Sequence, residues 1–248
     1  LGAAMEKVTP NWEVIYVNDC SPDNAEELLL ERARDNPRLT LISHARNFGA
    51  QTAFSTGLKQ ARGDAVVIMD GDLQDPPELI VDFVKLWLQG NDVVYGIRTK
   101  RSESLARNAG YKIFYRIFNR IAYIPIPLDA GEFSLMDRVV VDVIIECREY
   151  DRLIRGLRAY AGFKQVGVEF VRPPRFSGKS TQSLLDYVMW AYKSFTSYSL
   201  APLRFITSMA FAIMGILMLL LLFYLVAYLL RPVTPPGYMT TLILLLGL

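Results

Sequence analysis

Two aspartates one residue apart carry the clearest chemical signal in the chain. Asp70 and Asp72 follow the apolar run AVVIM in the stretch MDGDLQDPPEL, and Gln74 comes two residues later. On a turning strand end both carboxylates can face one ion, and carboxylate and amide oxygens suit Mg²⁺ or Mn²⁺. Such a cation neutralises a leaving diphosphate. We therefore predict a metal and diphosphate site at these three residues, and a helix-capping role for Asp75.

Other nucleotide and phosphate motifs fit less well. The sequence has neither GxGxxG nor GxxxxGK[ST], so a dinucleotide fold and a P-loop are not expected. A phosphatase of the haloacid dehalogenase type would end a strand in DxDx[TV] and phosphorylate the first Asp. Gln74 stands at the fifth position here, which weakens the phosphatase interpretation but leaves it as an alternative.

Composition excludes several classes of site. The 248 residues are 52% hydrophobic and 21% charged, with a net charge of +2, so a sizeable core is expected and a general polyanion or nucleic-acid binder is not. Cys20 and Cys147 lie far apart, which argues against a disulfide framework or a zinc site. The only histidine, His44, is expected to be structural, with its hydrogen bonds satisfied at a strand end.

Strands and helices alternate along the first hundred residues, which predicts an α/β fold with a mostly parallel sheet covered by helices on both faces. We expect strands at 12–19, 39–44, 65–70 and 92–98, and helices at 22–35, 49–62 and 76–90. Ser21 or Asp23 would cap the first helix, Gly63 would close the second, and Pro76 with Pro77 would begin the third.

Ligands in such folds lie beyond the carboxyl ends of the strands. Asp19, Asp70 and Asp72 all stand at expected strand ends. We therefore expect them to converge on one crevice.

The C-terminal part is predicted to cross a membrane. Residues 205–230 carry no charge and span about 39 Å as a helix, which exceeds the roughly 30 Å hydrocarbon layer. A second apolar run at 240–248 is expected to be a second span, cut off by the end of the chain. Basic residues before the first span, including Lys193 and Arg204, place residues 1–204 in the cytoplasm by the positive-inside rule.

Six motifs in order carry a family resemblance: VNDCSPDN, RNFGAQTAFSTGLKQARGD, MDGDLQDPPEL, DVVYGIR, DAGEFSLMDR and PPRFSGKS. Together they resemble the membrane-bound polyprenyl-phosphate glycosyltransferases of the family 2 type, the relatives of dolichyl-phosphate mannose synthase, over about residues 11–248. The resemblance implies a GT-A fold and metal-dependent, inverting sugar transfer at the cytoplasmic face of the inner membrane. The resemblance also implies a nucleotide diphosphate sugar, expected to be a UDP-sugar, as donor and polyprenyl phosphate, such as undecaprenyl phosphate, as acceptor.

The resemblance also assigns roles to particular residues. Asp19 would contact the nucleotide base, Arg46 would lie near the diphosphate beside Asp70, and Glu132 of DAGEF matches the position proposed as catalytic base. Asp72 and Asp129 join Glu132 as catalytic candidates, although Asp129 could equally serve a turn. From the residues alone, an ion pair of Glu132 with Arg138 or a helix cap is an equal alternative.

The lipid phosphate calls for cations near the membrane. The residues predicted to bind it are Arg98, Lys100, Arg101, Arg107 and Arg138. Residues 104–124 read as a basic amphipathic helix that fits a membrane surface, or a helix packed on the sheet.

The expected domains are a cytoplasmic GT-A catalytic domain at 1–180, an amphipathic juxtamembrane segment at 181–204 and transmembrane helices at 205–248. The first strand of the family, which ends in Pro-x-Tyr-Asn-Glu, has no counterpart in the sequence. A nucleotide-sugar-binding membrane scaffold without turnover therefore stays open as an alternative, and the two spans leave room for a homo-oligomer.

Overall fold

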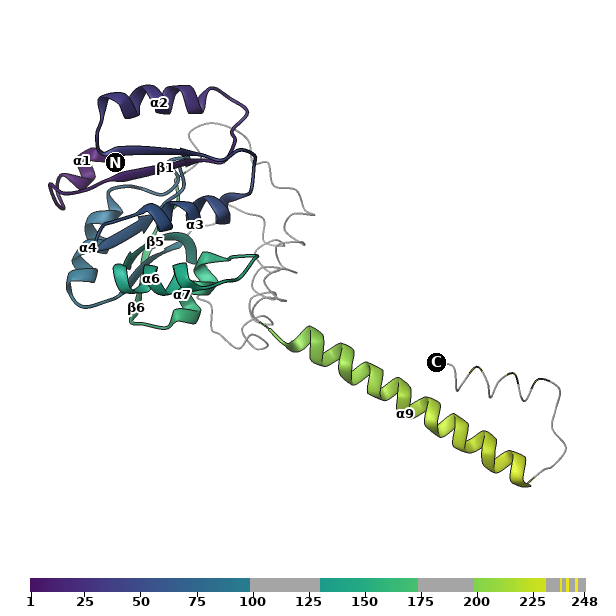
Figure 1. The fold of residues 1–248 in the computed structure, drawn as a ribbon. Coiled ribbons are helices and arrows are strands. Elements are labelled where there is room, and N and C mark those ends of the chain that lie inside the picture. Colours follow the sequence, from purple (N-terminus) through teal and green to yellow (C-terminus); the bar gives the residue numbers. More distant parts are fainter. Residues whose placement is uncertain (99–129, 174–198, 231–236, 238–239, 241–243, 245–248) are drawn as a thin grey trace. The chain divides into compact units, whose positions relative to one another are not determined.

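The computed structural model describes residues 1–98, 130–173 and 199–230, together with Gly237, Thr240 and Leu244 (Figure 1). The chain divides into two units, Leu1–Tyr198 and Ser199–Leu248. Each unit is described by itself.

A parallel pair of strands forms the first sheet. Strand β1 (Val14–Asn18) pairs with β2 (Leu39–Ser43), in a register that sets Val14 opposite Leu39. Helix α2 (Ala25–Asp35) connects them, after a short helix α1 (Gly2–Met5), and Figure 1 shows α2 and α3 (Ala50–Gln60) on opposite sides of this pair. Each strand ends toward the loops that carry the expected nucleotide residues.

The second sheet has four strands in the order β3-β5-β4-β6. Its strands are β3 (Ala65–Ile68), β4 (Val93–Arg98), β5 (Ala130–Asp137) and β6 (Gln165–Phe170). Strands β4 and β6 are parallel, whereas β5 runs antiparallel to both β3 and β4. The expected α/β class with parallel strands is confirmed, but the sheet is mixed because of β5.

Helices cover both faces of the second sheet, as expected. Adjacent residues of β4 point to opposite faces, so Val93 packs in a core with Leu58 of α3, while Val94 packs in another with Phe83. The first core also takes residues of α6 (Arg138–Glu146) and α7 (Ile154–Ala161), and the second takes residues of α4 (Leu79–Leu88).

Helix α3 packs against both sheets. A Cβ atom on Gly57 would lie 3.6 Å from Val17 of β1, while its neighbour Leu58 is buried in the core of the second sheet. The described strands form two ladders, because β1 and β3 do not pair with each other. Packing of α3, rather than a continuous ladder, joins the two sheets.

The expected strands and helices are found, but helices α2, α3 and α4 are each shorter than expected. Helix α3 ends at Gln60, with Ala61 in an extended conformation, so the expected cap at Gly63 is wrong. Helix α4 begins at Leu79, because Pro76 and Pro77 form the preceding turn and their carbonyls accept the N–H groups of Leu79 and Ile80. At α2 the cap position is taken by Asn24 without a side-chain hydrogen bond, and Asp23, one residue earlier, accepts the N–H of Ala25 at 3.2 Å, so the expected cap at Ser21 or Asp23 is wrong.

The second unit contains one long apolar helix, α9 (Ala201–Leu230). Within the described residues, Ala201–Ala227 is the one helix long and apolar enough to cross a membrane. Its large apolar side chains, such as Leu219 and Phe223, are exposed. The expected second span at 240–248 lies almost wholly outside the described residues.

Two glycine substitutions test the packing of the sheets. A Cβ atom on Gly96 would lie 2.6 Å from the ring of Phe170, which is itself packed edge-to-face on Phe133. We expect Gly96→Ala to lower the free energy of unfolding by about 1–3 kcal/mol, as overpacking does. We expect Gly57→Ala, in a helix with an ordinary 3.6 Å contact, to raise it by up to about 1 kcal/mol. Urea unfolding of the detergent-solubilised protein measures both, and equal effects would contradict the packing described for β4.

Candidate functional site

The loop after β3 is organised by its own aspartates. The N–H of Asp70 donates to Asp75 Oδ2 at 3.1 Å, and Asp72 Oδ1 accepts the N–H of Gln74 at 3.1 Å. Between them Leu73 has a φ of 60°, in the left-handed region that a branched side chain rarely adopts. A strained residue held in this way is characteristic of ligand-binding loops.

Asp75 does not cap α4, so that expectation is wrong. Its side chain is fully buried and bonds back to Asp70, while the cap position is taken by Glu78 without a side-chain hydrogen bond. Burial is the main reason that the pKa of Asp75 is raised, although the N–H of Asp70 and the charges of Arg172 and Arg98 act in the opposite direction. Asp75 therefore shapes the loop rather than the helix.

Two arginines approach this loop from neighbouring strands. Arg172, which follows β6, places Nη2 3.3 Å from Asp70 Oδ2. Arg98 ends β4, and its guanidinium lies so close to Gly131 that a Cβ there would be 2.8 Å from Nη2. Arg172 was missed by the sequence reasoning, although its position directly before the motif PPRFSGKS was a usable signal.

The donor set suits a hard divalent cation only with help from a ligand. Within the described ranges, no group of three or more His, Cys, Asp and Glu side chains is arranged to hold a metal. Asp70 and Asp72 supply two carboxylates, and Gln74, whose Nε2 donates to Pro173 O at 3.2 Å, supplies an amide oxygen. Mg²⁺ and Mn²⁺ are commonly held by one or two carboxylates together with water and substrate phosphates, so these residues fit such an ion.

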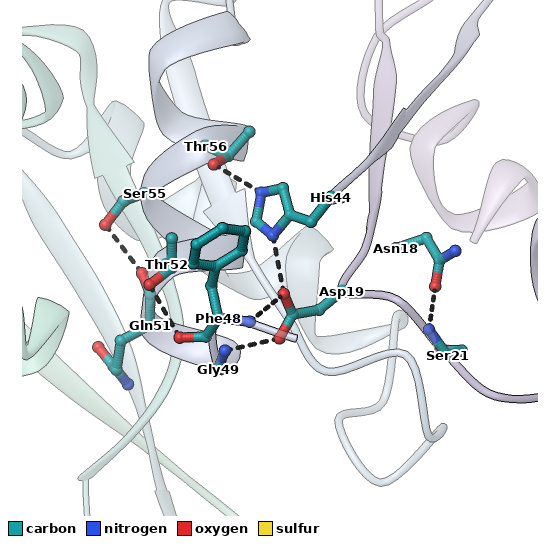
Figure 2. A network of polar contacts seen from close by, with 10 residues as sticks. All are labelled: Asn18, Asp19, Ser21, His44, Phe48, Gly49, Gln51, Thr52, Ser55 and Thr56. Atoms are coloured by element: carbon teal, nitrogen blue, oxygen red, sulfur yellow. Dashed lines mark hydrogen bonds and ion pairs between the residues drawn. The ribbon is translucent and has the colours of Figure 1, made fainter. Parts of the chain in front are cut away.

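Asp19 anchors the loop between β2 and α3 (Figure 2). Its Oδ1 accepts the N–H of Phe48 at 2.9 Å and lies 2.8 Å from His44 Nδ1, while its Oδ2 accepts the N–H of Gly49 at 2.7 Å. His44 Nε2 lies 3.0 Å from Thr56 Oγ1, so both ring nitrogens are hydrogen-bonded. The structural role expected for His44 is confirmed.

The electrostatics of Asp19 follow from these bonds. Burial alone raises the pKa of its carboxyl, but the hydrogen bonds from Phe48, His44 and Gly49 together outweigh burial and leave the pKa below its usual value. Beside them, the Arg46 guanidinium stacks 4.5 Å from the centre of the Phe48 ring. The expected contacts of Asp19 with a base and of Arg46 with a diphosphate remain predictions.

The side chain of Glu132, on β5, contacts the N-terminus of α7. Its Oε2 accepts the N–H of Arg155 at 3.1 Å, and its Oε1 accepts Gln51 Nε2 at 3.1 Å and lies 4.0 Å from Arg155 Nε. Of the two alternatives to a catalytic role, the helix cap is therefore present. The pair with Arg138 is not, because Arg138 donates to the carbonyls of Ala61 and Gly63.

Arg158 is a buried cation next to this carboxylate. It is 1% exposed, its three guanidinium nitrogens have no hydrogen-bond partner, and its charge lies 5.0 Å over the ring of Tyr95. Burial lowers the pKa of Arg158 to about 10, and the charge of Glu132 limits the decrease. Neither Arg158 nor Tyr95 was singled out from the sequence.

Four of the expected site residues lie outside the described residues: Lys100, Arg101, Arg107 and Asp129. The basic helix at 104–124 and the segment 181–198 lie there too. Arg138, expected near the lipid phosphate, lies at the start of α6, where its N–H donates to the carbonyl of Asp64 just before β3 and its guanidinium also pairs with Asp142 at 3.5 Å. Arg138 is therefore at the opposite end of β3 from Asp70. The roles of the four residues outside the described ranges remain predictions.

The Asp19 network predicts a pH-dependent stability. Because the pKa of Asp19 is lowered in the folded chain, its contribution is present above the ordinary value of about 4 and is lost as the pH falls through the lowered value. We expect Asp19→Asn to lower the free energy of unfolding by about 1–3 kcal/mol at pH 7, and by progressively less as the pH falls below about 4. Urea unfolding at pH 7 and at a series of acidic pH values measures this. Asp35→Asn, at an exposed position, is the control, and an effect of Asp19→Asn that is independent of pH would contradict the explanation.

Arg158 predicts a stabilising substitution. Burial of an unpaired charge costs several kcal/mol, whereas a cation–π contact contributes about 0.5–2 kcal/mol. We expect Arg158→Met to raise the midpoint of thermal unfolding by about 2–4 °C, the shift produced by about 1 kcal/mol in a domain of this size. Arg148→Met, at an exposed position, should leave it unchanged. A lower midpoint for Arg158→Met would mean that attraction to Glu132 and Tyr95 outweighs the cost of burial.

The chain is similar to a known protein family and to several known proteins. Residues 3–145 match the family model described as Glycosyl transferase family 2. The chain is 39% identical over 205 residues to the uncharacterized glycosyltransferase YkcC of Bacillus subtilis, a match that covers 82% of this chain and 64% of that relative. It is 36% identical over 252 residues to the uncharacterized glycosyltransferase sll0501 of Synechocystis, which covers 98% of this chain and 78% of the relative.

A third relative carries a more specific name. The bactoprenol glucosyl transferase of Shigella phage SfV is 34% identical over 195 residues, which cover 77% of this chain and 63% of the phage protein. The chain thus spans somewhat less than two thirds of YkcC and of this phage protein. The matches confirm the expected GT-A type of α/β fold, and since the family model covers more than half of the residues, the chain belongs to glycosyl transferase family 2.

Proposed function

We propose that the protein transfers a sugar from a nucleotide diphosphate sugar to polyprenyl phosphate, with a divalent cation and with inversion at the anomeric carbon. The observation that carries the proposal is the loop of Asp70 and Asp72 at the end of β3, with Arg172 3.3 Å from Asp70. Carboxylates that hold a cation, next to guanidinium groups, form a site for a diphosphate.

The acceptor is inferred from relatives and from α9. Several relatives are named bactoprenol glucosyl transferases, and a polyprenyl phosphate is a lipid. A lipid acceptor requires the enzyme to work at a membrane, and α9 is long and apolar enough to anchor it there. We propose a multi-pass protein of the inner membrane with its catalytic domain on the cytoplasmic side, and a UDP-sugar, with glucose first among the sugars to test, as donor.

The leaving diphosphate would be held by the loop after β3. Asp70, Asp72 and Gln74 would hold Mg²⁺ or Mn²⁺, which supplies charge neutralisation when it is bound. Arg172 and Arg98 would add positive charge from the neighbouring strand ends. Asp19 and Arg46 would contact the nucleotide from the loops after β1 and β2.

The acceptor needs alignment more than activation. A phosphate monoester has a second pKa near 6 and is largely ionised at neutral pH, so it needs no strong base. In-line approach to the anomeric carbon and compensation of charge are the harder requirements. In this proposal Glu132 orients the acceptor, and Arg98, Lys100, Arg101 and Arg107 are candidates to compensate the charge of its phosphate.

A transfer assay tests the function. Detergent-solubilised protein would be incubated with undecaprenyl phosphate, Mg²⁺ or Mn²⁺ and a panel of labelled nucleotide sugars, and label extracted into organic solvent would be counted. We expect transfer from one donor, loss of transfer with EDTA, and a decrease of at least about a hundredfold in Asp72→Asn and in Glu132→Gln. Asp35→Asn, at an exposed position at the end of α2, is the matched control and should retain activity.

The outcomes separate the alternatives. Nucleotide binding without transfer from any donor would favour a membrane scaffold. A phosphorylated Asp70, with hydrolysis that needs no lipid, would favour a phosphatase. Transfer that persists in EDTA and in Asp72→Asn would contradict the metal site.

A further inference from the structure

Gln51 lies in the first turn of α3 and connects three elements of the site. Its Nε2 donates to Glu132 Oε1 at 3.1 Å, and its Oε1 accepts the N–H of Ile154, the first residue of α7, at 2.8 Å. A single amide thus spans from α3 to β5 and to α7. In the sequence, Glu132 lies 81 positions and Ile154 lies 103 positions after Gln51.

The amide is matched to its two partners. The ionised Glu132 carboxylate offers only acceptors, so it requires a donor, while the N–H group of Ile154 is a donor and requires an acceptor. A glutamine satisfies both at once, whereas a glutamate or a methionine in its place would not. Glu132 Oε2 meanwhile accepts the N–H of Arg155, so Gln51 and Glu132 together satisfy the first two N–H groups of α7.

The backbone around Gln51 is also held in place. The loop that leads into α3 is bonded to Asp19 through the N–H groups of Phe48 and Gly49, and Ser55 Oγ donates to the carbonyl of Gln51 at 2.8 Å. Figure 2 shows the side chain of Gln51 directed away from the ring of His44. Asp19, the proposed nucleotide-binding residue, therefore holds the turn that carries Gln51, and the Gln51 side chain in turn holds the Glu132 carboxylate.

We propose that Gln51 is a positioning residue for the transfer reaction, which sets the Glu132 carboxylate and links it to the Asp19 side of the site. The proposal rests on the function proposed above. Gln51 touches no reacting atom in this role and acts through Glu132.

Gln51→Glu is the sharpest variant, because it removes one contact and keeps the other. The new carboxylate still accepts the N–H of Ile154, but it meets Glu132 without a donor and with a like charge. We expect kcat to fall about ten- to a hundredfold, with the KM for the sugar nucleotide changed less than about twofold. The acid limb of the pH–rate profile should move to higher pH, since two adjacent carboxylates disfavour ionisation of the pair.

Two further variants separate positioning from folding. Thr52→Ala, one residue along the same helix, removes a hydroxyl that donates to Phe48 O and should leave kcat and the pH profile unchanged. Gln51→Met removes both contacts, so hydrogen exchange at the N-terminus of α7 should become faster than in wild type. In Gln51→Glu that exchange should stay slow, because the acceptor for Ile154 is kept.

Failure of this role is distinct from failure of the proposed function. If the wild type transfers sugar and Glu132→Gln does not, but Gln51→Glu matches Thr52→Ala in kcat and pH profile, the positioning role is overturned and the function stands. If hydrogen exchange at the N-terminus of α7 is unchanged in Gln51→Met, the hydrogen bond from Ile154 to Gln51 does not support the positioning role, and the proposal is overturned. A wild type that transfers no sugar overturns both.

Discussion

The carboxylate of Asp19 fixes the start of α3, and much of the described structure depends on where that helix begins. Its hydrogen bonds to the N–H groups of Phe48 and Gly49 tie the end of β1 to the loop that follows β2. From that fixed start, α3 packs Gly57 against β1 and buries Leu58 in the core of the second sheet. The two sheets share no ladder, so the packing of this helix contributes to holding one against the other.

Buried charge is concentrated around the candidate site. Asp75 and Arg158 are both almost fully buried, and each has polar atoms without a partner. Groups of this kind lower stability, and elsewhere in a core they would be replaced by apolar side chains of similar size. Their position under the loop of Asp70 and beside Glu132 is consistent with a region in which electrostatic arrangement takes precedence over stability.

Local features were predictable from the sequence, and long-range pairings were not. Apolar runs bounded by polar residues located β1 to β4, and the DxD spacing located the loop after β3, because both signals lie within a few residues. The antiparallel insertion of β5 could not be predicted, since its pairing with β3 joins segments about seventy residues apart. The same limit explains why Arg172 was missed, because its partner Asp70 is 102 residues away. Asp75 was expected to cap the following helix, but its side chain accepts the N–H of Asp70 instead.

The surroundings of Glu132 bear on what the proposed reaction requires of it. Two of its hydrogen bonds come from Gln51 and from the backbone of Arg155, and Arg158 adds a positive charge nearby. A carboxylate that caps a helix is restricted in orientation. This restriction is a disadvantage for a general base that must move with its substrate, but it is an advantage for a carboxylate that orients the acceptor from a fixed position. Since a phosphate acceptor is already largely ionised at neutral pH, orientation is the greater requirement. The cap and the proposed catalytic role are therefore compatible, because the bonds that make Glu132 a structural residue also hold it where an acceptor could be aligned.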